Sequence, residues 1–311
     1  MISWRYHVVS IVAVVLAFGL GILAGTAVVN DEFVRELQEN YDRAQEERDA
    51  ARAEVARLER FAAALLPTLR DDQLLGRDAV VVTIEGLDRP AQLALEELGD
   101  AGADVLAALR LTGRALEPSA PDDVDALQVA LGTSSTDPVQ LTESLAEALG
   151  VRLAVGPDGE EAEDLLAALL AEGFVTADRD LDQADLRAIG GASQSIVVAA
   201  GGLRRDDLPA PGAFVLPFTE RLVQLGASVA VAGVTDDAYG TVATVRDDPE
   251  VPDCSVVTVD DLDLTIGGIA LVMGLERLLI DPDPGFRPGG DYGVEADALV
   301  PGGEPPASCR E

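Results

Sequence analysis

The sequence predicts an α/β protein in three parts: a single N-terminal transmembrane helix, a coiled-coil stalk, and a doubly wound α/β domain with a mostly parallel sheet. Residues 8–29 carry no charged side chain, residues 31–66 repeat apolar side chains at heptad spacing, and residues 79–280 alternate β-branched runs with amphipathic helices. The remaining segments are a short cytoplasmic N-terminus at 1–7, a linker at 67–78 and a Pro- and Gly-rich tail at 281–311.

The uncharged N-terminal segment is long enough for a membrane anchor. A helix over residues 8–29 measures about 33 Å, and a hydrocarbon core is about 30 Å thick. Arg5 precedes the segment and Asp31 follows it, so the positive-inside rule predicts a signal anchor that places everything after it outside the cytoplasm. One alternative is a cleaved secretory leader, with a small-residue cleavage site near Gly25. The other is a helix buried in a protein core.

Small residues recur every fourth position within this segment, at Ala17, Gly21 and Gly25. Such spacing allows two membrane helices to approach closely and predicts a helix-dimer face. The alternative is that these glycines reflect only the general frequency of Gly in membrane helices.

The stalk prediction rests on an apolar seam between Glu- and Arg-rich positions. Arg48 is the single charged residue in the seam, and Pro67 is expected to end the helix, which would be about 54 Å long. A parallel dimer, or a higher oligomer, would bury this seam; the alternative is one helix folded against the domain. The seam residues are Val34, Leu37, Tyr41, Ala44, Ala51, Val55, Leu58, Ala62 and Leu65.

The α/β prediction begins with a strand–helix–strand unit. "AVVVTIEG" at 79–86 reads as a strand, "PAQLALEELGDAGA" as a helix and "DVLAALRLT" as a second strand. The segment from about 118 to 188 is expected to be mostly helical. Strands return in "SQSIVVAAGG", "GASVAVAGV" and "CSVVTVDD", and residues 264–280 form a buried helix before the tail, which is expected to be irregular.

Composition excludes some partners. The net charge is −34 and the chain contains no Lys, so its surface repels nucleic acid. Cys254 and Cys309 fit no zinc or redox spacing, and in an oxidising compartment they are candidates for a disulfide. Two unpaired thiols and a metal role are the alternatives.

The sequence contains no recognisable catalytic motif, and it predicts neither an enzyme nor a cofactor. The single histidine, His7, lies beside the membrane segment and away from the domain. The loop "AAGGLRRDD" carries Arg204 and Arg205 after a strand; it either binds an anion or only makes a turn.

An acidic run follows the last strand, where folds of this class bind ligands. Asp260, Asp261 and Asp263 could hold a hard cation such as calcium or magnesium. The alternative, favoured here, is that Asp263 and Thr265 cap the N-terminus of the last helix.

Two stretches resemble a known family. The opening Trp4-Arg5-Tyr6-His7-x-x-Ser10, together with "VVTVDDLDLTIGGIALVMGL" and "GGDYG" in residues 256–293, resembles the actinobacterial copper transport protein MctB family, also called SteB. The resemblance implies a single-pass envelope protein in copper homeostasis or efflux, and a role in cell separation with a membrane partner.

Copper enters by this resemblance alone. Copper(I) prefers Cys, Met and His, but the two cysteines, His7, Met1 and Met273 do not cluster in the sequence. The alternative function is a non-enzymatic dimeric scaffold that binds envelope proteins during remodelling or cell separation. An extracytoplasmic hydrolase is the weakest hypothesis, because no nucleophile or base is identified.

Overall fold

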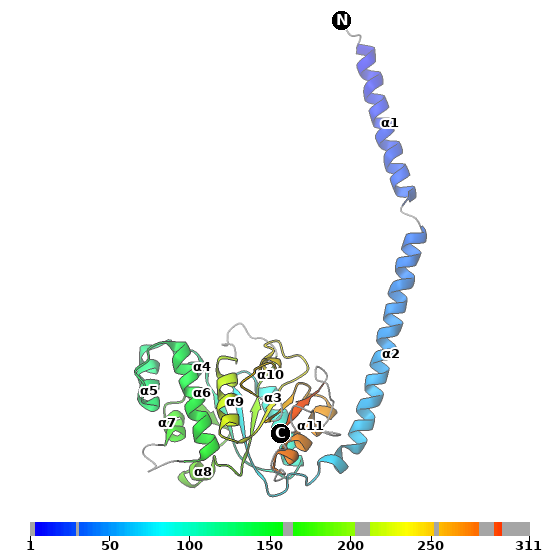
Figure 1. The fold of residues 1–311 in the computed structure, drawn as a ribbon. Helices are drawn as coiled ribbons and strands as arrows, with labels where there is room; N and C mark the ends of the chain where they lie inside the picture. The colour runs from blue at the N-terminus through cyan, green and yellow to red at the C-terminus, as the bar shows by residue number, and fades with distance from the viewer. Residues whose placement is uncertain are drawn as a thin grey trace. The chain divides into compact units, whose positions relative to one another are not determined.

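The N-terminal part of the chain is helical, as predicted. The computed structural model describes residues 4–28, 31–157, 164–202, 212–251, 255–279 and 289–293. The chain forms two units, Met1–Arg60 and Phe61–Glu311. The first contains α1 (Trp4–Val28) and most of α2 (Asp31–Arg70), whose last residues belong to the second (Figure 1). Among the described residues, no helix is both long enough and apolar enough to cross a membrane.

The sequence predicts that Pro67 ends the stalk helix, and this is wrong, because α2 continues to Arg70. A proline removes one backbone N–H and bends a helix, but contacts beyond it can hold a further turn. Here Arg70 forms ion pairs with Glu97 at 3.3 Å and with Asp100 at 2.8 Å, both on the first helix of the α/β domain. The connection to the first strand is therefore shorter than predicted.

The second unit is built on a seven-stranded sheet with the order β3-β2-β1-β4-β5-β6-β7. Every pairing is parallel except that of β2 with β3, so the predicted mostly parallel sheet is confirmed. The strands are β1 (Asp78–Ile84), β2 (Asp104–Leu111), β3 (Val175–Ala177), β4 (Ser195–Ala199), β5 (Ser228–Ala232), β6 (Val256–Val259) and β7 (Gly290–Tyr292).

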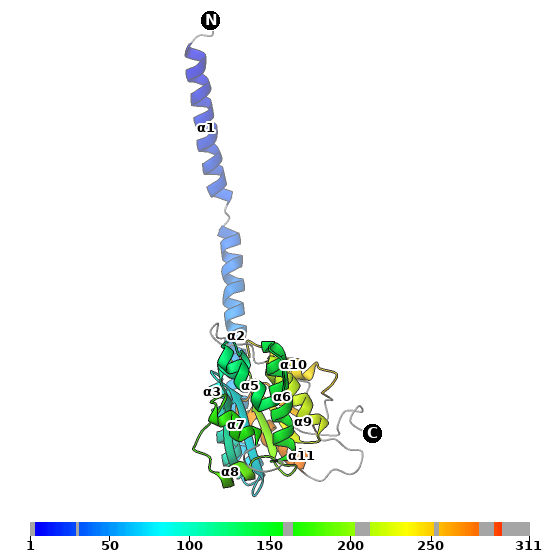
Figure 2. The ribbon, with the colours of Figure 1, turned by 90° about the vertical axis from the view of Figure 1, so that its left-hand side faces the viewer.

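The helices of this unit are α3 (Asp88–Asp100), α4 (Gly113–Leu116), α5 (Pro121–Leu131), α6 (Pro138–Val155), α7 (Leu165–Ala171), α8 (Gln183–Ala188), α9 (Gly212–Gln224), α10 (Thr241–Arg246) and α11 (Thr265–Leu279). They cover both faces of the sheet. Figure 2 shows helices on both sides of the sheet. In β1, Val80 and Val82 enter one core with α6 and α9, and Ala79 and Val81 enter a second core with α3 and α11. Burial on both faces explains why β1 is apolar without alternation.

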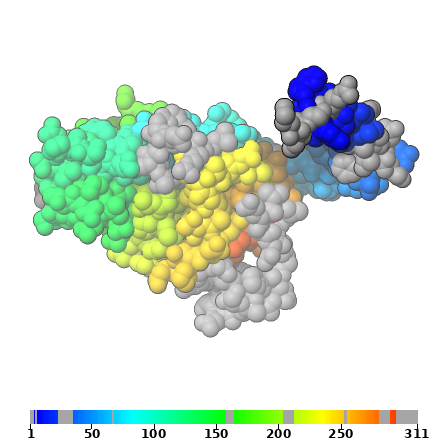
Figure 3. Space-filling model, turned by 90° about the horizontal axis from the view of Figure 1, so that it is seen from above, coloured from blue at the N-terminus to red at the C-terminus, as the bar shows by residue number. Residues whose placement is uncertain are grey.

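The largely helical middle of the chain is also confirmed, in α5 to α8. Figure 3 shows the green segment of α5 and α6 next to the yellow segment of α9 and α10, and α6 packs along α9. The strand β3 within this region was not predicted, because its three residues carry no apolar periodicity.

The prediction of an irregular tail is wrong at residues 290–292, which form β7 on the edge of the sheet. Gly290 pairs with Val257 and Tyr292 with Val259, in parallel. A three-residue strand beginning with Gly has no strand propensity of its own, so its conformation is set by pairing with β6.

We expect Gly274→Ala to destabilise the domain by about 1–3 kcal/mol, because α11 packs tightly on β6. A Cβ at Gly274 would lie 2.7 Å from Val257 Cγ1. Gly99 on α3 is the control, since no atom lies within 4 Å of the corresponding position and Ala there should be neutral or slightly stabilising. Urea unfolding followed by circular dichroism measures both variants, and equal effects would contradict this packing.

Candidate functional site

The carboxyl edge of the parallel strands is the place where a doubly wound sheet binds ligands, at the point where the strand order reverses. In this sheet the reversal lies between β1 and β4. Thr83 near the end of β1 is buried, and its hydroxyl lies 3.0 Å from the carbonyl oxygen of Ala199 on β4. Glu85, just beyond β1, accepts a hydrogen bond from the Gly113 amide at 2.7 Å. These contacts set the positions of the loops at this edge.

The glycine loop after β4 is held by Asp237. Gly201 has a φ of +112°, and a Cβ there would lie 2.9 Å from Asp237 Oδ2, so the position requires glycine. Asp237 Oδ1 accepts from the Gly202 amide at 3.2 Å, and Oδ2 accepts from the Thr241 amide at 2.7 Å at the start of α10. The Gly202 amide in the loop considered for anion binding therefore already donates to the carboxylate of Asp237.

The end of β6 is organised by Arg246, the last residue of α10. Its guanidinium donates to Asp260 Oδ2 at 2.5 Å, to the Thr258 hydroxyl at 2.7 Å and to the Tyr292 carbonyl at 2.8 Å. Asp291 on β7 accepts from the Thr258 hydroxyl at 2.7 Å and lies 3.6 Å from Arg246 Nε. One arginine thus connects α10, β6 and β7.

The capping of α11 by Asp263 and Thr265 stays a prediction, and the described contacts of Asp263 lead to other elements. Asp263 Oδ1 accepts from the backbone N–H and the hydroxyl of Thr235, at 2.8 and 2.9 Å, and Oδ2 lies 3.4 Å from Arg89. Its carboxylate therefore reaches across the sheet edge to the loop after β5 and to α3. The sequence could not show this, because both partners are distant in the chain.

Asp261 is fully buried, and within the described structure neither of its carboxylate oxygens has a hydrogen-bond partner. Burial, followed by the neighbouring charges of Asp260 and Asp263, raises the pKa of Asp261 to about 7. Among the described residues, no three His, Cys, Asp or Glu side chains form a group that could hold a metal ion, so the cation site considered as the less favoured reading of this acidic run is not seen there.

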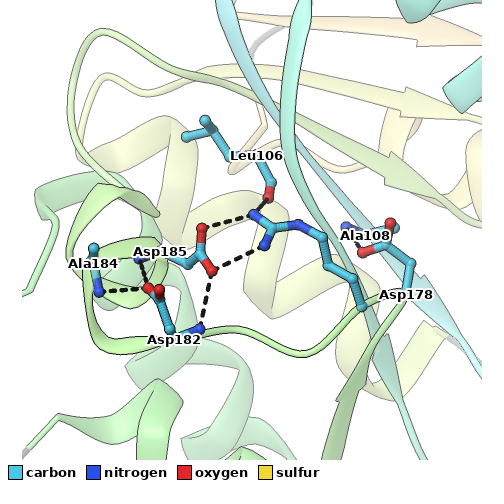
Figure 4. A network of polar contacts seen from close by, with 7 residues as sticks. Leu106, Ala108, Asp178, Asp182, Ala184 and Asp185 are labelled. Atoms are coloured by element: carbon cyan, nitrogen blue, oxygen red, sulfur yellow. Dashed lines mark hydrogen bonds and ion pairs between the residues drawn. The ribbon is translucent and has the colours of Figure 1, made fainter.

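A second polar network protects the opposite edge of the sheet (Figure 4). Arg179 donates to both carboxylate oxygens of Asp185 at 2.9 Å and to the Leu106 carbonyl at 2.9 Å. The hydrogen bonds from Arg179 and from the Asp182 amide lower the pKa of Asp185 to about 2. Asp178 accepts from the Ala108 amide at 3.0 Å, so side chains bond the backbone of β2 beyond the reach of β3.

A hollow of about 500 Å³ lies between α3 and the edge formed by β2 and β3. Its lining includes the ion pair of Asp88 with Arg110, at 2.9 Å, and the apolar side chains of Ala91 and Leu95. Its size is in the range of small-molecule sites, and its polar lining residues, apart from the buried Thr83, are exposed.

The predicted oligomer contacts remain predictions. Gly21 has open space around it, and seam side chains such as Leu37, Tyr41 and Leu58 are exposed to solvent. Predicted residues that lie outside the described part of the chain are Arg204, Arg205, Cys254 and Cys309. The surroundings of Gly25 and the side chain of Val34 lie outside it as well.

Comparison with known proteins identifies the family. A family model described as "Copper transport outer membrane protein, MctB" matches residues 1–301. The chain belongs to the MctB family. It is 28% identical over 302 residues to the Copper transporter MctB of Mycobacterium tuberculosis, covering 90% of this chain and 93% of that one. The Copper transporter MctB of Mycobacterium leprae is 26% identical over 307 residues, with the same coverage.

The match confirms the resemblance found in the sequence and extends it across nearly the whole MctB-family chain. The family description is that of a membrane transport protein. Arg246 was not predicted as a site residue, because it is an isolated arginine in a short helix. The signal that could have found its environment is the "GGDYG" motif, which supplies Asp291 and Tyr292.

We expect Arg246→Gln to destabilise the protein by about 3–5 kcal/mol, because it leaves the carboxylate of Asp260 buried without its partner. The matched control is Arg179→Gln, which breaks an ion pair open to solvent and should cost much less. Thermal or urea unfolding measures both variants. Equal losses would show that burial of the Arg246 pair does not set its contribution.

Proposed function

We propose that this protein acts in copper homeostasis at the cell envelope, in the transport or efflux of copper. The observation that carries the proposal is the family match over residues 1–301, together with relatives named copper transporters that the chain covers to 93% of their length. Copper is the cargo in this proposal. No residue of the described structure is assigned as its ligand.

Although no helix in the described part of the chain meets the length and apolarity of a membrane span, we also propose, from the uncharged residues 8–29, that this segment is a permanent anchor and that the α/β domain lies outside the cytoplasm. α1 has 25 residues, and large apolar side chains such as Val9, Ile11 and Phe18 are more than half exposed along it. An apolar helix with such side chains exposed is stable in hydrocarbon and costly in water. Arg5 before the apolar run and Asp31 after it support a cytoplasmic N-terminus.

Cells of the source organism that lack this protein should accumulate more cell-associated copper than the parent and grow less well in added copper. Mass spectrometry of washed cells measures the metal. The complete chain should restore the parental level, and Gly99→Ala is the complementation control because its substitution touches nothing. A chain without residues 4–28, expressed at equal level, should not restore it. Unchanged copper in the deletion strain would contradict the proposed function.

The alternative function, a dimeric scaffold for envelope proteins, is supported by the stalk. Tyr41 is 68% exposed and Leu37 is 60% exposed, although both lie in the apolar seam of α2. A second copy aligned in parallel would bury the seam as a coiled coil, and Ala17, Gly21 and Gly25 would extend the contact into α1. We propose a homodimer on this ground. A partner protein of the envelope would then bind the paired domains.

The dimer predicts a position-dependent disulfide in membranes. Ala44→Cys places a thiol in the seam, where the two copies face each other, and mild oxidation should give a crosslinked dimer on non-reducing gels. Glu46→Cys is the matched control, since it lies nearby on the opposite face of α2. Equal crosslinking of the two variants, or none above the unsubstituted chain, would contradict a parallel coiled coil.

A further inference from the structure

The buried carboxyl group of Asp261 lies where three elements meet. It follows β6, it packs against the first turn of α11, and it faces the residue that follows β7. A Cβ at Gly267 on α11 would lie 2.7 Å from Asp261 Oδ1, and one at Gly293 would lie 3.1 Å from the same oxygen. The space around this carboxyl group is therefore too small for a side chain on either glycine.

A second carboxylate faces the same space. A Cβ at Gly293 would lie 1.9 Å from Asp260 Oδ1, so oxygens of Asp260 and Asp261 both border the position that Gly293 leaves open. Asp260 directs its other oxygen to Arg246. The glycine after β7 is thus required by two acidic side chains at the end of β6.

The cations around Asp261 are committed to other groups. Arg246 on α10 bonds Asp260 and lies near Asp291 of β7, while Arg89 of α3 lies beside Asp263 in the turn before α11. The carboxyl groups of Asp260, Asp261, Asp263 and Asp291 therefore lie around two arginines. One of the two, Arg89, is largely exposed. The neutral form of Asp261 is the one that this environment accepts, because an ionised carboxylate without donors is costly to bury.

We propose that β7 stays docked on β6 while Asp261 is neutral, and that loss of its proton to solvent as the pH rises releases β7, because the ionised carboxylate is not tolerated in this buried position. Of the elements around Asp261, β7 is the one held least. It has three residues and pairs with β6 alone. Its Tyr292 carbonyl accepts from the Asp260 amide at 3.3 Å and from Arg246 at 2.8 Å, and Asp291 accepts from the Thr258 hydroxyl at 2.7 Å. β7 adds one side chain, that of Tyr292, to the second hydrophobic core, whereas β6 and α11 each contribute several.

The direction of the pH response follows from linkage. The pKa of Asp261 is raised from 3.8 to about 7, by burial first and then by Asp260 and Asp263. The docked state therefore binds the proton more tightly than a state in which water reaches the carboxyl group. This contribution to docking is complete below about pH 3.8, falls as the pH rises from there, and is lost once the pH has passed about 7. Ionised Asp261 would also compete with Asp260 and Asp291 for Arg246.

Hydrogen exchange of the complete chain in detergent micelles tests this, at about pH 5.5 and about pH 8.5, with rates corrected for intrinsic exchange. The peptide containing residues 290–292 should lose protection by about tenfold or more at the higher pH, while β1 should not. Asp261→Asn keeps the shape but cannot ionise, so its β7 should stay protected at both values. Asp125→Asn, at an exposed position on α5, should behave like the unsubstituted chain.

Gly293→Ala provides a second variant whose outcome does not depend on Asp261→Asn folding. Its Cβ would collide with Asp260 Oδ1, so β7 should be unprotected at both pH values. Unchanged protection of the unsubstituted chain across this range would overturn the proposal, as would the same pH response in Asp261→Asn. Restoration of protection at high pH by calcium or magnesium would also overturn it, because the neutralising species would then be a cation.

Discussion

The constraint on which this domain depends is that a parallel sheet must be covered on both faces. β1 sends Val80 and Val82 into one core and Ala79 and Val81 into the other, so both of its faces are apolar, and its buried polar side chain, Thr83, lies near its carboxyl end. Polar groups are therefore confined to the ends and edges of the sheet. The carboxyl end collects Asp237, Asp260, Asp261 and Asp263, and their arrangement determines how the loops and the last strand are held.

This confinement has an electrostatic cost in a chain of net charge −34 that contains no Lys. Arginine supplies the positive charge of the side chains, and Arg246 shows its use: its planar guanidinium bonds a carboxylate, a hydroxyl and a carbonyl at once. Asp261 shows the limit, because its neighbours already occupy the nearby arginines. The sequence does not distinguish one acidic residue from another, but in the folded domain burial gives a few carboxyl groups, such as those of Asp260 and Asp261, specific partners or a raised pKa.

Much of the fold could be predicted because its central strands are continuous apolar runs. β4 and β5 are buried almost throughout and contain Val and Ala, which distinguishes them from the amphipathic helices between them. β7 could not be predicted, since Gly290 and Asp291 form a strand only by pairing with β6. The extension of α2 past Pro67 likewise depends on Arg70 and its distant partners. The sequence also predicts that Asp260 to Asp263 follow the last long strand, and in the structure they follow β6. Arg246 and Asp237 act through contacts that no local motif encodes.

The two edge strands of the sheet, β3 and β7, are short, and their length limits how copies of the protein can interact when they lie close together on one surface. Each edge strand of the sheet has three residues. A neighbouring molecule therefore meets too few unpaired backbone amides and carbonyls to add a strand of its own. Copies held close at high local density can then touch through helices without their sheets fusing into fibrils. Short edge strands thus allow copies of the protein to lie close together while each copy keeps its own fold and the contacts between copies stay reversible.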